Sequence, residues 1–241
     1  MAWLLWIYDD VANFAHLRLG AALDHAQRIL TFEQLLHLAP ELDLNRWLVA
    51  HRTLGLIVSD YYDNAHFIVP LTLLAYLWWR RPDIYRPLRD SLVLINLIAL
   101  IVFWRYPVAP PRLLAGSGFT DVASATQAFG SWHTGALATH ANQLAAMPSL
   151  HVAWASWCAV AIWRMSGRSW ARALAFVHPL LTTYAVLATA NHFLADVLAG
   201  ALTAALAVLI VDRTPRRRPL RRADHRQPHP EARSSPQNLR C

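Results

Sequence analysis

His192 and Asp196 are the residues whose types and spacing most directly suggest chemistry. They stand four positions apart at the start of an apolar stretch, and residues four apart on a helix share one face. A carboxylate beside an imidazole can hold it in one tautomer and stabilise its cationic form. The spacing therefore predicts an oriented catalytic histidine. The alternative interpretation is a polar pair at a helix end that is only packed or solvated.

Two further groups of polar residues border apolar stretches. Pro148, Ser149 and His151 open one such stretch, and Arg105 and Arg112 follow another. A helix that begins near His151 would present free backbone N–H groups and a positive dipole end to an anion. The planar guanidinium of arginine matches the oxygens of a phosphate and stays charged. Two histidines combined with two arginines favour phosphoryl transfer.

In such a reaction the two histidines would have different roles. His192 would attack phosphorus, while His151 would protonate the leaving oxygen and later deprotonate the acceptor. Taken alone, His151 fits an interfacial helix cap equally well. Arg105 alone fits a side chain that extends its charge to the membrane surface.

A metal site is the competing chemistry. Asp121, His133 and His140 lie in one segment and could supply ligands. The segment has no closely spaced histidine pair and no cluster of carboxylates. Catalysis without a metal or another cofactor is therefore expected.

The composition indicates a membrane protein. Hydrophobic residues fill 56% of the 241 positions, above the roughly 45–50% of ordinary soluble domains. Long apolar stretches predict an all-α fold, a polytopic transmembrane helical bundle. All 22 residues counted as lysine or arginine are arginine, which excludes Schiff-base and lysine-nucleophile chemistry.

The surplus of positive over negative charge lies in the C-terminal segment. Residues 213–240 hold nine arginines and two acidic residues, which equals the whole net charge of +7. Since the rest of the chain is close to neutral, this charge does not predict a nucleic-acid partner. The sequence predicts an N-terminal helical region at 1–62, a membrane core at 63–212 and a disordered tail at 213–241.

Five apolar stretches are predicted to cross the membrane: residues 65–79, 88–104, 150–163, 174–190 and 193–211. Residues 46–62 form either an interfacial helix or a poor span, which brings the total to about six. The arginine-rich loops at 80–89 and 164–172 share one side with the tail, and the positive-inside rule assigns that side to the cytoplasm. The segment 105–147 and the polar groups described above then lie on the outer face.

Together these polar groups resemble the signature of the type-2 phosphatidic acid phosphatase superfamily of membrane phosphoesterases. The first family motif, KxxxxxxRP, is matched by Arg105 and Arg112, with arginine for lysine and leucine for proline. The second, PSGH, is matched by Pro148–His151 with leucine for glycine. The third, SRxxxxxHxxxD, is matched only in His192 and Asp196.

The departures from these motifs resemble one branch of the superfamily. Ala185 and Val186 stand where the third motif has Ser-Arg. This change, with the leucine of the second motif, is similar to the branch that contains fungal inositol phosphorylceramide synthase and its bacterial relatives. Tyr62, His66 and Asp121 lie in two short segments that also resemble this branch, which makes them candidate substrate-binding residues.

The resemblance implies roles for the matched residues. His192 would be the nucleophile and form a phosphohistidine without a metal, Asp196 would be its partner, and His151 would be the acid–base. Three further residues would contact the phosphate: Arg105, Arg112 and Ser149.

The sequence therefore predicts an integral membrane phosphotransferase or phosphatase acting on a lipid-linked phosphate. The donor would be a phospholipid or a lipid or polyprenyl phosphate, and the acceptor an inositol, another polyol, a sugar hydroxyl or water. Abundant arginine and alanine without lysine favour a bacterial plasma membrane, with the active site on its outer face. A non-catalytic lipid-binding or transport protein and a structural membrane subunit are the alternatives.

Overall fold

The computed structural model describes residues 18–122, 125 and 144–214. Over these residues the chain is helical, as predicted, and the only pairing of extended backbone found there is one bridge between Val108 and Ala145. The helices are α2 (Leu19–Leu35), α3 (Glu41–Ala50), α4 (Arg52–Arg80), α5 (Pro82–Arg105), the 3-10 turn η2 (Pro111–Leu113), α8 (Leu150–Met165), α9 (Ser169–Leu174), α10 (Val177–Ala188) and α11 (Leu194–Arg213). The proposed tail beyond residue 214 lies outside the described residues.

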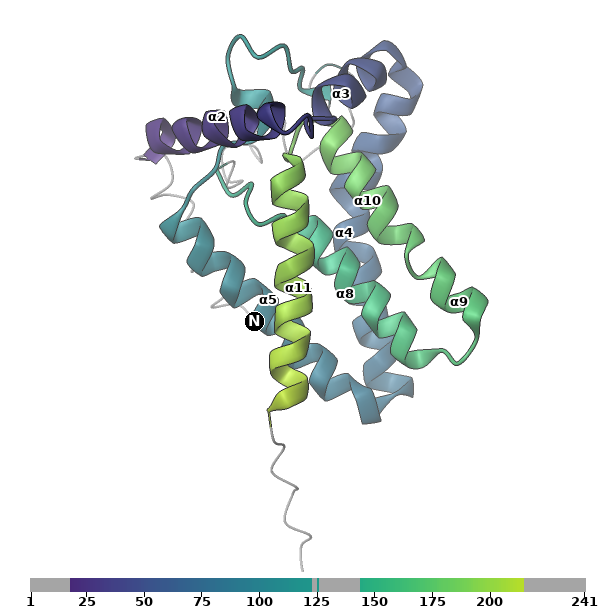
Figure 1. Ribbon diagram of the computed structural model, residues 1–241. Helices are drawn as coiled ribbons and strands as arrows, with labels where there is room; N and C mark the ends of the chain where they lie inside the picture. Colours follow the sequence, from purple (N-terminus) through teal and green to yellow (C-terminus); the bar gives the residue numbers. More distant parts are fainter. Residues whose placement is uncertain (1–17, 123–124, 126–143, 215–241) are drawn as a thin grey trace, which may run out of the picture.

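The helices form a bundle that is covered at one end. Helices α4, α5, α8, α10 and α11 pack together, and α11 contacts both α5 and α8 (Figure 1). Helix α2 lies across the end of this bundle where α11 begins (Figure 1). The first residues of α8 and α11 therefore meet beneath the N-terminal helices.

Three helical segments of the described chain are long and apolar enough to cross a membrane: Pro82–Arg105, Ser169–Ala188 and Leu194–Arg213. Helix α8 is apolar but has only 16 residues. Helix α4 has 29 residues, and Asp60 and Asp63 interrupt its apolar sequence. This architecture fits an integral membrane protein, and the number of about six spans stays a prediction.

Helix α4 joins two stretches that the sequence predicted as separate helices. Residues 46–62 and 65–79 were predicted as separate helices, whereas the chain breaks at His51 and then continues as one helix to Arg80. The polar residues near the expected break bond within the helix, since Asn64 donates to the Asp60 carbonyl at 2.9 Å. The domain boundary predicted at residue 62 falls inside α4, and the division itself stays a prediction.

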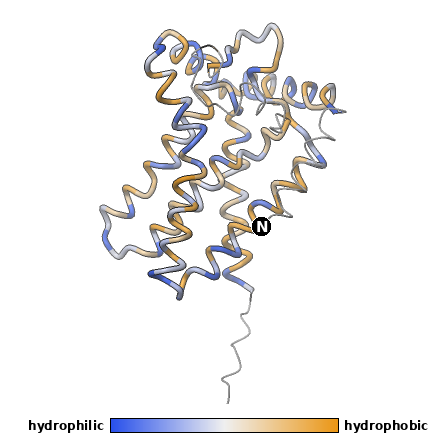
Figure 2. Tube along the Cα trace, turned by 180° about the vertical axis from the view of Figure 1, so that it is seen from behind, coloured by the Kyte–Doolittle hydropathy of each residue, from blue (hydrophilic) through white to orange (hydrophobic). Residues whose placement is uncertain are grey.

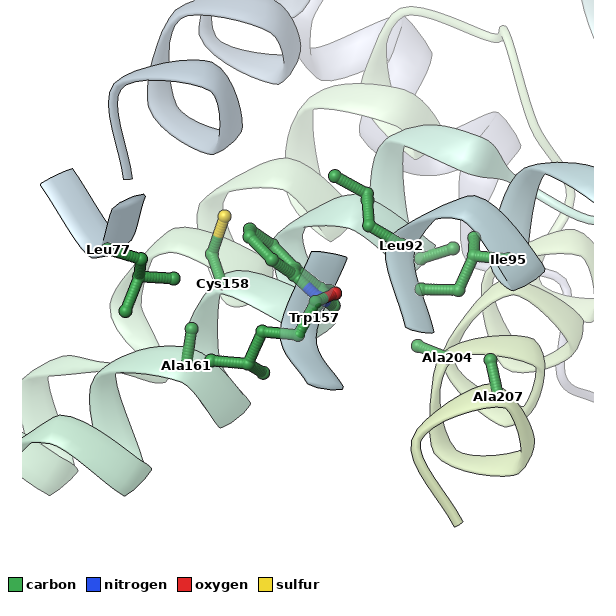
Figure 3. Packing of buried hydrophobic residues seen from close by; sticks show 10 residues of the cluster. Leu77, Leu92, Ile95, Trp157, Cys158, Ala161, Ala204 and Ala207 are labelled. Carbon is green, nitrogen blue, oxygen red and sulfur yellow. The ribbon is translucent and has the colours of Figure 1, made fainter. Parts of the chain in front are cut away.

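A buried apolar cluster holds the middle of the bundle together. Trp157 of α8 lies among residues of α4, α5 and α11 (Figure 3), and its side chain is fully buried. Its indole N–H donates to the Leu88 carbonyl at 2.9 Å and lies 3.2 Å from the Ser91 hydroxyl. Since an indole N–H usually finds a partner when buried, these contacts fix how α5 packs on α8. The small residues Ala204 and Ala207 let α11 approach the same cluster.

Arginines mark the end of the bundle opposite α2. Arg164 at the end of α8 pairs with Asp212 at the end of α11 at 2.6 Å. Arg81, between α4 and α5, donates to the Met165 carbonyl at 3.4 Å. Hydrophilic residues lie at this end and at the opposite end of the bundle, while apolar residues prevail along the helices (Figure 2). The predicted separation of arginine-rich loops from the histidines is therefore present in the fold.

Candidate active site

His192 and Asp196 are in contact, as predicted, but the predicted helix does not include both. Nδ1 of His192 lies 3.4 Å from Oδ2 of Asp196, and both side chains are almost fully buried. The expectation of a shared helix face is wrong, because α11 begins at Leu194 and His192 precedes it. Oδ2 of Asp196 accepts the Phe193 N–H at 2.9 Å, which directs the carboxylate back toward His192. The 3.4 Å separation exceeds a normal hydrogen bond, and such catalytic contacts often shorten when substrate binds.

A tight turn presents His192 after the end of α10. Ala190 has a φ of 56°, in the left-handed region. The N–H groups of Asn191 and His192 both donate to the Val186 carbonyl, at 3.1 and 3.2 Å, as in a common way of ending helices. A non-glycine residue in this conformation costs roughly 1–2 kcal/mol. The surrounding packing holds the turn, since Ala190 is fully buried.

Ser149 joins the starts of α8 and α11. Its backbone N–H donates to the Asp196 carbonyl at 3.0 Å, and its buried hydroxyl accepts the Val152 N–H at 3.5 Å. A Cβ atom at Gly200 would lie 2.3 Å from the Ser149 carbonyl oxygen. Only glycine therefore permits this approach, which sets how close His151 comes to the turn that carries His192.

The ring of His151 lies at the centre of an aromatic and histidine cluster. Its centroid is 5.7 Å from that of His192, with the rings 62° apart. Tyr62 stacks on His151 at 4.3 Å, and His66 lies 4.1 Å away. Both residues belong to α4, so this helix forms one wall of the site. The candidate substrate residues Tyr62 and His66 thus meet His151.

Arg112 is a buried cation beside the turn that carries His192. Its N–H donates to the Ala190 carbonyl at 3.0 Å, and Nη1 donates to Oδ1 of Asn191 at 2.5 Å. Nε lies 3.5 Å from Oδ2 of Asp121, and the Arg112 side chain is 4% exposed. Burial lowers the pKa of the guanidinium, and the charges of Asp121 and other acidic groups raise it. An arginine nevertheless stays charged in proteins.

Arg105 does not join this cluster. It ends α5 with an exposed side chain, and its guanidinium lies 5.9 Å from the ring centroid of Trp104. The sequence predicted that two arginines and two histidines meet at one site. The structure brings Arg112, His151 and His192 to the same region but leaves Arg105 outside it. The position fits the alternative interpretation of a charge at the membrane surface, and the phosphate contact of Arg105 stays a prediction.

A metal site is the competing hypothesis. In the described part of the chain, no three His, Cys, Asp or Glu side chains are placed to hold a metal ion. Asp121, one of its expected ligands, is paired with Arg112. His133 and His140, the other two, lie outside the described residues.

The N-terminal helices supply contacts that the sequence did not predict. Glu33 of α2 accepts the Ala195 N–H at 2.6 Å, in the first turn of α11. Asn45 of α3 donates to the carbonyls of Thr120 and Ala188 and accepts the Thr120 N–H, each at 2.9 Å. These two residues therefore link the N-terminal helices to the first turn of α11, to the loop before Asp121 and to the end of α10.

Glu33 shares its buried position with a second carboxyl group, that of Glu41. The two side chains are 4% and 0% exposed, and burial raises the pKa of both carboxyl groups. Burial, followed by the neighbouring carboxyl group of Glu41, raises the pKa of Glu33 to about 8, although the Ala195 N–H lowers it. At neutral pH Glu33 is therefore largely protonated.

This raised pKa predicts that stability falls as pH rises. An unfolded glutamate loses its proton near 4.5 and the folded Glu33 near 8, so the unfolded chain binds fewer protons between these values. The stabilisation is complete below the lower value and is lost as pH rises through the upper one. Glu33→Gln keeps an acceptor for the Ala195 N–H without a titrating proton and should flatten the decline. Unfolding midpoints in detergent across this pH range measure it, and an unchanged slope in Glu33→Gln would contradict the assignment.

The comparisons with known proteins give one result of consequence. The sequence model of a family described as the PAP2 superfamily matches residues 27–210. The match includes all the histidines, arginines and carboxylates of the site described above. Curated proteins and solved structures yield no significant match to the chain.

Proposed function

The chain belongs to the PAP2 superfamily, and from this we propose that it is an integral membrane phosphotransferase or phosphatase that uses a phosphohistidine intermediate. Its substrate would be a lipid-linked phosphate. The observation that carries the proposal is the buried contact of His192 with Asp196, beside the ring of His151 and the cation of Arg112. A lipid-binding or structural role would give these buried polar groups no purpose.

The reaction would proceed in two half-reactions at His192. With Nδ1 facing Asp196, Nε2 would form a bond to phosphorus while the bond to the leaving oxygen breaks, and His151 would give that oxygen a proton. In the second half, His151 would take a proton from the acceptor, whose oxygen attacks phosphorus. The phosphorus–nitrogen bond then breaks and its electron pair returns to His192.

We place the phosphate between Arg112 and the first turn of α8. The guanidinium carries a fixed positive charge, and the N-terminus of a helix favours an anion. The buried Ser149 at this helix start would add a hydroxyl contact. Tyr62, His66 and Asp121 would contact the remainder of the substrate, because they surround His151 and Arg112.

The acceptor decides whether the enzyme is a transferase or a hydrolase. The sequence resemblance to inositol phosphorylceramide synthase favours an inositol or another polyol hydroxyl, and water is the alternative. Purified protein with a lipid phosphate labelled on phosphorus, with and without inositol or sugar alcohols, tests this. Label in the alcohol means transfer, and label in inorganic phosphate means hydrolysis. Label that stays in the lipid with every substrate offered would overturn the proposal.

We further propose that the site faces the outside of a bacterial plasma membrane. The arginines at the opposite end of the bundle support this, by the positive-inside rule. With Cys158 and Cys241 replaced by alanine, Ser117→Cys should react with an impermeant thiol reagent on intact cells, and Ser169→Cys only after lysis. Labelling of position 169 alone in intact cells would reverse the orientation.

Arg112→Ala is expected to lower turnover about a hundredfold, because a preorganised donor to the transition state is worth about 2.7–4 kcal/mol. Excess EDTA should leave the wild-type rate unchanged if this cation takes the place of a metal. Arg105→Ala is the matched control, and its exposed position predicts a much smaller loss. The measurement is lipid phosphate turnover by all three proteins. Inhibition by EDTA that added Mg²⁺ or Zn²⁺ reverses would replace the arginine mechanism with a metal site.

A further inference from the structure

A chain of hydrogen bonds links the end of α10 to the guanidinium of Arg112. Oγ1 of Thr189 donates to the Ala185 carbonyl at 2.7 Å, and Nδ2 of Asn191 donates to Oγ1 of Thr189 at 2.8 Å. Oδ1 of Asn191 then accepts from Nη1 of Arg112 at 2.5 Å. Thr189 is 1% exposed, Asn191 is 4% exposed, and the Arg112 side chain is 4% exposed. Water therefore has little access with which to replace any of these bonds.

The direction of every bond in this chain follows from the groups involved. A hydroxyl has one hydrogen, and the Ala185 carbonyl can only accept it, so Thr189 must accept from Asn191. A guanidinium only donates, so the atom of Asn191 that faces Arg112 must be Oδ1. Both ends of the chain thus require the same orientation of the Asn191 amide. Removal of the Thr189 hydroxyl would leave the buried amide N–H of Asn191 without its acceptor.

We propose that Thr189 and Asn191 are positioning residues for Arg112, which hold its guanidinium beside the catalytic turn in the orientation that receives an anionic phosphate. Asn191 does this without charge. A carboxylate in its place would neutralise the guanidinium, which already lies 3.5 Å from Asp121. The amide therefore fixes Arg112 and leaves its charge for the substrate. The identification of this anion as a lipid-linked phosphate rests on the proposed function above.

The arrangement also couples Arg112 to His192. The N–H of Arg112 donates to the Ala190 carbonyl, so backbone and side chain of the arginine both bind the turn that ends in His192. The cation and the proposed nucleophile are therefore tied to the same turn. Thr189 is assigned no substrate contact of its own, but it is linked to Arg112 through Asn191. Loss of its hydroxyl should therefore affect anion binding.

The test compares Thr189→Val, which keeps the shape and removes the hydroxyl, with Thr189→Ser, which keeps the hydroxyl. The probe is inorganic phosphate, titrated calorimetrically into the full-length protein in detergent. Thr189→Val should weaken phosphate binding about tenfold, and Thr189→Ser should stay within about twofold of wild type. Asn191→Asp should weaken binding by at least as much as Thr189→Val. Unfolding midpoints of each variant identify general loss of structure.

A double-mutant cycle separates positioning from structural support. If Thr189 acts through Arg112, Thr189→Val should have no further effect on phosphate binding in the Arg112→Ala background. An equal loss in both backgrounds would overturn the proposal, as would a wild-type dissociation constant in Thr189→Val. Phosphate binding can be measured without turnover. If Thr189→Val weakens phosphate binding only when Arg112 is present, but the protein turns over no lipid phosphate, the proposed function alone is refuted. Turnover of lipid phosphate with unchanged binding in Thr189→Val would refute the positioning role alone.

Discussion

His192→Ala is expected to lower turnover by about 10⁴-fold or more, because the first half-reaction has no other nucleophile to replace an imidazole oriented by Asp196. The contact of 3.4 Å between Nδ1 and the carboxylate is the structural reason. Wild-type protein quenched during turnover should carry labelled phosphate that acid removes and alkali does not, as expected of a phosphohistidine. His192→Ala should carry none.

Two variants make this result interpretable. His192→Gln keeps most of the buried volume, which separates loss of the nucleophile from a cavity at a nearly fully buried site. His51→Ala replaces an exposed histidine between α3 and α4 and should retain full activity. Substantial turnover in both position-192 variants, or acid-labile label in either, would contradict the nucleophile assignment.

Gly200→Ala is expected to lower both turnover and stability, although no substrate contact is assigned to this residue. The added Cβ would lie 2.3 Å from the Ser149 carbonyl oxygen, and a backbone atom cannot rotate away as a side chain can. The start of α8 must therefore move by about an ångström, which displaces His151 from His192 and can cost about a hundredfold in rate. Stability should fall by about 1–3 kcal/mol, as in other overpacked cores.

Gly20→Ala in α2 is the matched control for this substitution. A Cβ at Gly20 has no atom within 4 Å, and alanine at a helical position should leave stability unchanged or raise it slightly. Turnover and unfolding midpoints are measured for both variants. Wild-type activity in Gly200→Ala would mean that the spacing of α8 and α11 does not determine the geometry of the histidines.

Sequence patterns predicted the helices best where the apolar stretches are long. Residues 88–104 and 193–211 fall within or almost within α5 and α11, because such stretches have few alternatives to a buried or membrane-spanning helix. The stretch at 174–190 was less accurate, since α9 and α10 divide the segment and the chain turns after Ala188. The tight turn at residues 189–192 contains no glycine or proline from which to predict it.

The candidate site was predicted in part. The spacing of His192 and Asp196 identified a real contact, although the carboxylate reaches His192 from the first turn of α11 rather than along a helix face. Arg105 was expected in the site because it lies seven positions before Arg112, but sequence spacing does not fix where a helix ends. Asn191 was missed because a polar residue beside a predicted nucleophile is unremarkable without its partners.

A weak signal for Glu33 was present in the sequence. Ala22, Ala26 and Leu30 mark the buried face of α2, and Glu33 continues the same helical spacing three residues later. An acidic residue on an apolar face requires a partner. The partner lies 162 residues away in the chain, and helical periodicity contains no information about contacts at such separations.

The hydrogen bonds of Asn45 and Glu33 have a consequence for how this chain can diverge. Together they tie α2 and α3 to three later segments, at Thr120, Ala188 and Ala195. A recombination event that exchanged the N-terminal helices for unrelated ones would leave those backbone groups without partners, even with every motif residue retained. The N-terminal helices and the turn that carries His192 can therefore be inherited only as one unit, or replaced only by helices that again bring an amide and a carboxyl to these two places.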